Sequence, residues 1–302
     1  MRKIAFGYST RCNIKCEHCV AADGSGEHVK MDLTQAKDII SELASAQIRG
    51  ISFTAGEPLI YLDDICELLK ICREYGMYTR VVTNSFWAQT VERADSYVEQ
   101  LKNSGLSQLR LSYSRWHQKN VARENIVNAA QSCMKNGMDY FVSFVTDFSE
   151  QDDLFEDYLR HHKLIFFPEP VIFSGRAESF ERIPIRTDYQ ENCCPMNPYL
   201  APNLDLYACC DAGSHFTNTN FFYLGNAKQT SIDELFVKSE TNSLYNHIRN
   251  MGISGIASFA GFKARDIIHY RKCELCEKLF NSPDMRKILE GEARSGLAAM
   301  YK

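Results

Sequence analysis

The sequence lacks any run of about 18 apolar residues, the length that a helix needs to cross a membrane. It also lacks the apolar stretch of a secretory signal peptide, because MRKIAFGYST carries two basic residues but no apolar run before Cys12. These two absences predict a cytoplasmic protein that is not attached to a membrane.

An excess of charge of one sign is missing as well. Lysine and arginine total 34 against 38 for aspartate and glutamate, which leaves a net charge of −4 over 302 residues. Such a balance does not favour binding to nucleic acid or to anionic lipid. There is no low-complexity tract and no short repeat, and the hydrophobic fraction of 45% is enough for a large core. The composition is typical of a globular enzyme with one large domain and one smaller domain.

Cysteine, by contrast, is plentiful, with 12 residues in the chain. A disulfide scaffold does not explain them, because such scaffolds are short secreted chains with a signal peptide. In the reducing cytoplasm, clustered cysteines more often hold a metal or take part in redox chemistry. Cys66, Cys72 and Cys133 stand singly in predicted helices, so we assign them to the core as small apolar residues.

Strands and helices alternate regularly before residue 177. The pattern predicts strands at 3–9, 50–54, 80–83, 109–113, 140–145 and within 164–173, and helices at 33–47, 60–75, 90–103, 121–135 and 151–162. This order predicts βαβ units and a parallel sheet, and right-handed crossovers would curl it into a partial (βα)6 TIM-like barrel. In such barrels the chemistry lies at the C-terminal ends of the strands. Short strands, turns and cysteines follow, so we predict an α/β protein with a barrel at 1–176 and a smaller domain at 177–302.

Three cysteines follow the first predicted strand at once. Cys12, Cys16 and Cys19 have the spacing C-x3-C-x2-C. Three thiolates can bind three irons of a 4Fe–4S cluster and leave the fourth iron open for a substrate or cofactor. A zinc knuckle is the alternative, although zinc would require a fourth ligand. With this position after a first strand, the motif resembles that of the radical S-adenosylmethionine (SAM) enzymes.

Other segments at the predicted rim carry the same resemblance. TAGEPL (54–59) resembles the family's GGEP motif, with Ala55 in place of the first glycine, and VVTNSF (81–86) resembles its TNG strand end, with Ser85 in place of glycine. The resemblance implies that SAM is bound by His18, Gly56, Glu57, Asn84, Ser112 and Arg123.

The resemblance also implies a reaction. An electron, supplied by a donor such as flavodoxin or ferredoxin, would pass through the cluster to SAM and break its C5′–S bond. The resulting 5′-deoxyadenosyl radical would take a hydrogen from an unactivated C–H bond. The protein would position the reactants and exclude water.

A second group of cysteines lies late in the sequence. NCCPMNPYLAPNLDLYACCDAG, FYLGNA and CELCEKLF together resemble the SPASM/twitch extension of one branch of these enzymes. The resemblance implies an auxiliary 4Fe–4S cluster, for which we choose Cys194, Cys209, Cys273 and Cys276. Either Cys193 or Cys194 would supply the first ligand, and zinc is an alternative occupant because C-x2-C serves zinc equally well.

The sequence is similar, more narrowly, to radical SAM epimerases of ribosomally synthesised peptides (RiPPs). The similarity rests on ISFTAGE, TNSFW, SYSRWH, the Cys209–Cys210 pair and CELCEKLFNS. It implies a peptide substrate whose L-residue becomes a D-residue, with Cys210 donating the returning hydrogen atom. The alternative is that Cys210 is a ligand or an idle thiol. One departure is that Met196, Asn197 and Pro198 follow the Cys-Pro pair where the family has an acid.

Several functions stay open at this point. A RiPP enzyme that forms cross-links or thioethers, a twitch dehydrogenase of a small molecule, and a non-catalytic iron–sulfur or zinc module all fit the cysteine pattern. Trp87, Trp116 and Phe173 would either line a substrate site at the rim or belong to the core.

Overall fold

The computed structural model describes residues 2–21, 28–181, 196–210, 221–263 and 270–280, together with positions 287 and 291. Cys193 and Cys194 lie outside the described residues, so the structure does not place them. In the part of the chain that is described, no helix has both the length and the apolar character to cross a membrane.

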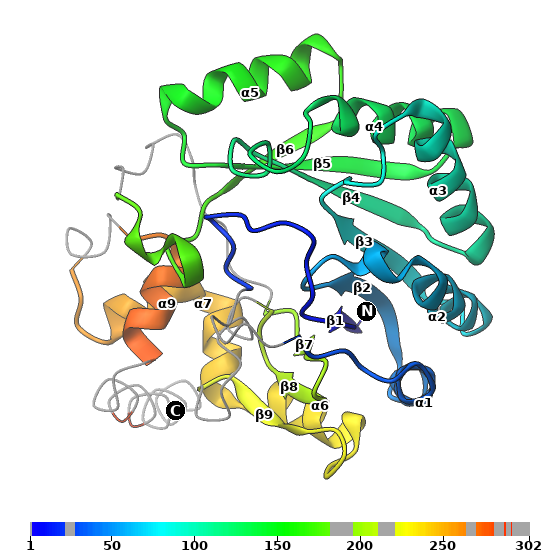
Figure 1. Cartoon of the computed structure of the whole chain (residues 1–302). Coiled ribbons are helices and arrows are strands. Elements are labelled where there is room, and N and C mark those ends of the chain that lie inside the picture. The colour runs from blue at the N-terminus through cyan, green and yellow to red at the C-terminus, as the bar shows by residue number, and fades with distance from the viewer. Residues whose placement is uncertain are drawn as a thin grey trace.

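Six parallel strands form the first part of the sheet, and their spatial order follows the sequence (Figure 1). The strands are β1 (Arg2–Gly7), β2 (Ile48–Thr54), β3 (Tyr78–Thr83), β4 (Gln108–Tyr113), β5 (Asp139–Thr146) and β6 (Phe166–Pro170). The helices between them are α1 (Leu33–Ser45), α2 (Leu62–Glu74), α3 (Val91–Ser104), α4 (Glu124–Asn136) and α5 (Glu150–His161), with a short 3-10 turn, η1 (Pro58–Tyr61), before α2. The predicted α/β fold with a partial TIM-like barrel is confirmed.

The ends of these helices follow from local chemistry. Asp32 caps α1, because its side chain accepts a hydrogen bond from the backbone N–H of Gln35 at 3.1 Å. Gly76 after α2 and Gly137 after α4 have φ values of +64° and +61°, a left-handed conformation that glycine adopts without strain. α2 and α4 therefore end just before the strands that follow them.

The two faces of the sheet differ in character. In β3, Thr79, Val81 and Thr83 are buried against the helices, whereas Tyr78 and Arg80 lie on the opposite, inward face of the barrel. The main hydrophobic core therefore fills the layer between helices and sheet. Cys72 and Cys133 are buried within this core and Cys66 packs against it, as predicted.

The later part of the chain extends the same sheet beyond β1. The strand β7 (Tyr199–Leu200) runs parallel to β1, and β8 (Asp205–Tyr207) and β9 (Tyr223–Asn226) follow as antiparallel neighbours. Next come α6 (Ile232–Thr241), α7 (Ser243–Phe259), which is interrupted at Gly252, and α9 (Lys272–Phe280), beside the β7–β9 strands in Figure 1. The division at residue 176 stays a prediction, since the sheet runs through both parts.

Candidate functional site

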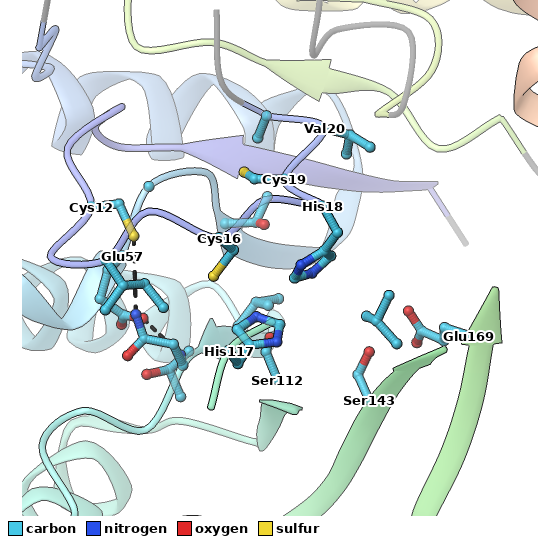
Figure 2. A pocket seen from close by; sticks show the side chains of 18 of the residues that line it. Cys12, Cys16, His18, Cys19, Val20, Glu57, Ser112, His117, Ser143 and Glu169 are labelled. Atoms are coloured by element: carbon cyan, nitrogen blue, oxygen red, sulfur yellow. Dashed lines mark hydrogen bonds between the residues drawn. The ribbon is translucent and has the colours of Figure 1, made fainter. Parts of the chain in front are cut away.

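The loop after β1 carries Cys12, Cys16 and Cys19 to a cavity of about 280 Å³ at the C-terminal ends of the strands. Figure 2 shows the three cysteines on this loop, with His18 and His117 close to one another nearby. Eight of the nine residues predicted to bind this cluster or SAM line this one cavity: Cys12, Cys16, His18, Cys19, Gly56, Glu57, Asn84 and Ser112.

The turn after β2 holds the cysteine loop in place. The backbone N–H of Glu57 donates to the carbonyl of Arg11 at 2.8 Å. Gly56 has a φ of +55°, and a Cβ atom there would lie 2.2 Å from the Arg11 oxygen. Only glycine allows this approach of two backbones, so the glycine of the TAGEPL motif is required by the cysteine loop itself.

Glu57 and Asn84 connect this turn to β3. The buried Glu57 carboxylate accepts hydrogen bonds from the backbone N–H groups of Asn84 at 2.7 Å and Leu59 at 3.1 Å. The Asn84 side-chain amide donates to the Asn13 side chain at 2.9 Å and lies 4.0 Å from the Cys12 sulfur. Both residues therefore hold the loop in place as well as lining the cavity.

The far end of the loop is clamped by Arg176, in the short 3-10 turn η2 (Gly175–Ser179) after β6. Its Nε donates to the carbonyl of Cys16 at 2.8 Å, and its backbone N–H donates to the carbonyl of Cys19 at 3.2 Å. No motif in the sequence marked Arg176, because the contact joins segments far apart in the chain.

Burial dominates the electrostatics of the cavity. It raises the pKa of Cys12 to about 11 and that of Cys16 to about 12, so these thiols would stay protonated without a cation to bind them. Burial, and then the charges of Arg176 and Arg115, lower the pKa of His18 to about 4. Neutral imidazole and thiols that require a metal to ionise suit an iron–sulfur centre.

His117 is a site residue to which the sequence assigned no role of its own; it is the last residue of the SYSRWH stretch. Its buried Nδ1 lies 2.7 Å from the hydroxyl of Ser114, and its ring centre lies 4.6 Å from that of His18. The ligand atoms of Cys16, His18 and His117 lie within 4.8 Å of one another. This set could also hold zinc, but Cys12 and Cys19 on the same loop complete the three thiols of an open 4Fe–4S cluster.

The remaining predicted SAM residues differ in their placement. Ser112 lines the cavity from β4. Arg123 is not among the lining residues; it lies at the start of α4 with a side chain that is 63% exposed, beside Glu124 and over the ring of Tyr158. Its predicted role stays a prediction. Arg110, Ser143 and Glu169 also line the cavity and were not predicted.

The three aromatic residues considered for the rim are buried. Trp87 is in the main core, where its indole N–H donates to the Thr83 hydroxyl at 3.0 Å. Trp116 and Phe173 form a small cluster with Val171 and Ala177. Trp116 still packs near the site, because its ring centre lies 5.0 Å from that of His18.

A second cavity of about 640 Å³ adjoins the first along the inward face of the barrel. The two cavities share Val20, Ala21, Thr54, Val82 and Arg110 as lining residues. Cys210, three residues after the end of β8, lines this second cavity together with Tyr199. Cys210 and the cysteine loop therefore open on adjoining spaces.

Three other late cysteines belong to the described residues. Cys209 is buried, and Cys273 and Cys276 are half-buried on one face of α9. α9 packs near the start of β9, because the ring of Phe280 stacks on that of Phe221 with the ring centres 4.4 Å apart. The next residue, Phe222, accepts a backbone hydrogen bond from Ala208 at 2.8 Å, which links this packing to the segment that carries Cys209, while Cys194 lies outside the described residues.

The comparison with known families agrees with this geometry. The sequence profile of the radical SAM superfamily matches residues 7–161, just over half of the chain, from the end of β1 to the end of α5. The chain belongs to the radical SAM superfamily. Members of this superfamily use a 4Fe–4S cluster and SAM, and the three thiols, together with a buried His18 Nδ1 that has no hydrogen-bond partner among the described residues, fit these cofactors.

Individual relatives are more distant. The chain is 24% identical over 135 residues to YydG of Bacillus subtilis, a protein that is named for peptide biosynthesis; the match covers 44% of this chain and 42% of YydG. It is 31% identical over 106 residues to the PqqA peptide cyclase of Bradyrhizobium diazoefficiens, covering 34% of this chain and 26% of the cyclase. The chain thus spans less than half the length of these curated relatives.

Among solved structures, the fold resembles that of Streptococcus suis SuiB, crystallised with its precursor peptide SuiA. The TM-score is 0.50 at 16% identity, and the match covers 91% of this chain and 75% of SuiB. At that identity the likeness concerns the fold, including the region after the barrel.

Proposed function

We propose that this chain is a radical SAM enzyme that modifies a ribosomally synthesised peptide, and that the modification is the epimerisation of an L-residue at its Cα atom. The observation that carries the proposal is the position of Cys210. It lines the cavity that adjoins the cysteine-loop cavity, and it comes from β8 whereas the cysteine loop comes from β1.

That placement suits an inversion. Cys12, Cys16 and Cys19 would hold the cluster beside SAM, and together these cofactors would supply the radical chemistry that removes the hydrogen atom from Cα. A hydrogen atom returned from the same side would restore the L-residue. The Cys210 thiol supplies it from the other side, and a thiol S–H bond is weak enough to give its hydrogen to a carbon radical.

The thiol must then be restored. After donation, the Cys210 sulfur needs one electron and one proton before the next turnover. Cys194, Cys209, Cys273 and Cys276 would hold an auxiliary 4Fe–4S cluster, which would supply this electron from flavodoxin or ferredoxin. Cys209 is next to Cys210 in the chain, and Phe280 of α9 stacks on Phe221, close to the start of β9.

A peptide substrate is supported by the relatives. YydG is named for peptide biosynthesis, the PqqA enzyme is a peptide cyclase, and SuiB was crystallised with a precursor peptide. The acid that the epimerases have after Cys-Pro is absent here, and Asn197 lines the second cavity in that region. Proton handling or substrate docking at this point therefore differs from the family pattern.

The experiment is co-expression of the enzyme with the short open reading frames next to its gene, followed by turnover in deuterated water. Epimerisation predicts a product that gains one deuteron at an inverted Cα, because a thiol exchanges its hydrogen with solvent. A product two daltons lighter without deuterium would show a cross-linking or dehydrogenating enzyme instead. Iron and sulfide without any SAM cleavage would indicate a non-catalytic module.

A further inference from the structure

The inward face of the barrel carries three cations along one cavity. Lys3 of β1, Arg80 of β3 and Arg110 of β4 all line the cavity that reaches Cys210. The space exists because the inward positions of β1 and β2 that line it beside Lys3 hold small side chains, namely Ala5, Gly50, Ser52 and Thr54. A closed TIM barrel would fill this volume with bulky branched residues, so the open space here is suited to a ligand.

The three cations are not equally neutralised. Arg110 forms an ion pair with Glu169 and donates to the Ser143 hydroxyl at 3.0 Å. Arg80 donates from Nε to the side-chain oxygen of Gln108 at 2.7 Å, and its guanidinium lies 5.2 Å from the centre of the Phe141 ring. Neither of these partners carries a negative charge, and the carboxylates of Glu169 and Asp139 attract Arg80 without forming an ion pair with it.

Lys3 lines the same cavity from β1. Its aliphatic stem lies over Gly50, where its Cγ atom is 3.2 Å from the position that a Cβ of residue 50 would take. Among the described residues, no carboxylate lies within 4.0 Å of the charged atoms of Lys3 or Arg80. Burial, and then the charge of Arg110, lower the pKa of Arg80, so an anion entering the cavity would relieve repulsion between like charges.

We infer that this cavity binds a carboxylate of the peptide substrate, held by Lys3 and Arg80, while the residue to be modified lies toward Cys210 and the cysteine loop. This inference rests on the proposed peptide-modifying function. The carboxylate belongs either to an aspartate or glutamate side chain or to the C-terminus of the peptide. Both sources present the same planar anion, which a guanidinium binds through two parallel hydrogen bonds.

The test uses the reconstituted enzyme with SAM and a positional-scanning library of acetylated heptapeptides. One arm compares Asp and Glu with Asn and Gln at each position in peptide amides, and a second arm compares a free C-terminal carboxylate with its amide. Retention on the enzyme is quantified by mass spectrometry. We expect about tenfold stronger retention of the acidic form in one arm, which corresponds to ~1.4 kcal/mol.

Substitutions connect this preference to the cavity. Arg80→Gln and Lys3→Gln should each lower it several-fold, Arg80→Lys should keep most of it, and Arg93→Gln on the exposed face of α3 should leave it unchanged. Lys3 is exposed, so its variant tests the inference even if Arg80→Gln fails to fold. Equal retention of acidic and amide peptides, or a preference that survives both glutamine variants, would overturn it. Because binding is measured without turnover, an acid preference combined with a non-epimerised product would count against the proposed function alone.

Discussion

The two groups of cysteines are assembled in different ways. Cys12, Cys16 and Cys19 lie in one short loop whose backbone is gripped by the turn at Gly56 and by Arg176. Cys209 and the α9 pair are distant in the chain, and their elements are linked only through tertiary packing such as that of Phe280 on Phe221. The first group is defined by local spacing, whereas the second depends on tertiary structure, and variants in the two groups should therefore fail in different ways.

The largest effect is expected from the first group. Replacing Cys12, Cys16 and Cys19 together by alanine should reduce 5′-deoxyadenosine formation to the level of the enzyme-free reaction, because we propose that these thiols hold the cluster that passes the electron to SAM. Circular dichroism should show an intact fold, since the loop lies outside the main core. Cys72→Ala in α2 is the control and should keep SAM cleavage. Continued 5′-deoxyadenosine formation by the triple variant would contradict the assignment.

The second group should show a partial loss. Replacing Cys194, Cys273 and Cys276 by alanine should lower the iron content from about eight to about four per chain and stop product formation. SAM cleavage should persist, because the first cluster is untouched. Iron and sulfide analysis after anaerobic reconstitution measures this loss of iron. An unchanged iron content in the variant, or zinc in the wild type, would show that these cysteines do not hold an auxiliary iron–sulfur cluster.

The turn that grips the cysteine loop should respond to pH. Burial raises the pKa of Glu57 from 4.5 to about 7, although the N–H groups of Asn84 and Leu59 oppose the shift. An acid with a raised pKa binds its proton more tightly when folded, so its contribution to stability falls as pH rises through this window. Compared with Glu57→Gln, the iron-free wild type should lose about 3 kcal/mol of its free energy of unfolding between pH 4.5 and pH 7.

Denaturant unfolding at a series of pH values measures that difference. The matched variant Glu67→Gln, at a partly exposed position of α2, should show no such loss. If the difference in unfolding free energy between wild type and Glu57→Gln does not change across this pH range, the Glu57 carboxyl group is not held in a buried, protonated state.

The smallest effect is expected at the two departures from the family motifs. Ala55 and Ser85 have φ values of +66° and +62°, where an L-residue is strained. Ala55→Gly should therefore stabilise the protein by about 0.5–1 kcal/mol in thermal unfolding. Gly56→Ala is the opposite case, since its Cβ would lie 2.2 Å from the Arg11 oxygen, and it should destabilise the loop strongly. Destabilisation by Ala55→Gly would show that the alanine side chain has a packing role.

The sequence predicted the barrel strands, the helices between them and the cysteine loop because these depend on local patterns. Asp32 and Gly76, for example, act through neighbours a few residues away. It did not predict Arg176, His117 or Glu169 as site residues, because their partners come from other strands and from the loop after β1. Arg123 illustrates the converse: a residue assigned by resemblance whose side chain extends to the surface.

The central claim is that Cys210 acts on the substrate from the side opposite the first cysteine group. It is tested most directly with Cys210→Ala, incubated with peptide and SAM in deuterated water. We expect the variant to keep its iron and its 5′-deoxyadenosine formation but to yield no inverted, deuterated residue. Inversion with deuterium at Cα in this variant would contradict the claim, and a loss of iron would show that Cys210 is a ligand and not the hydrogen donor.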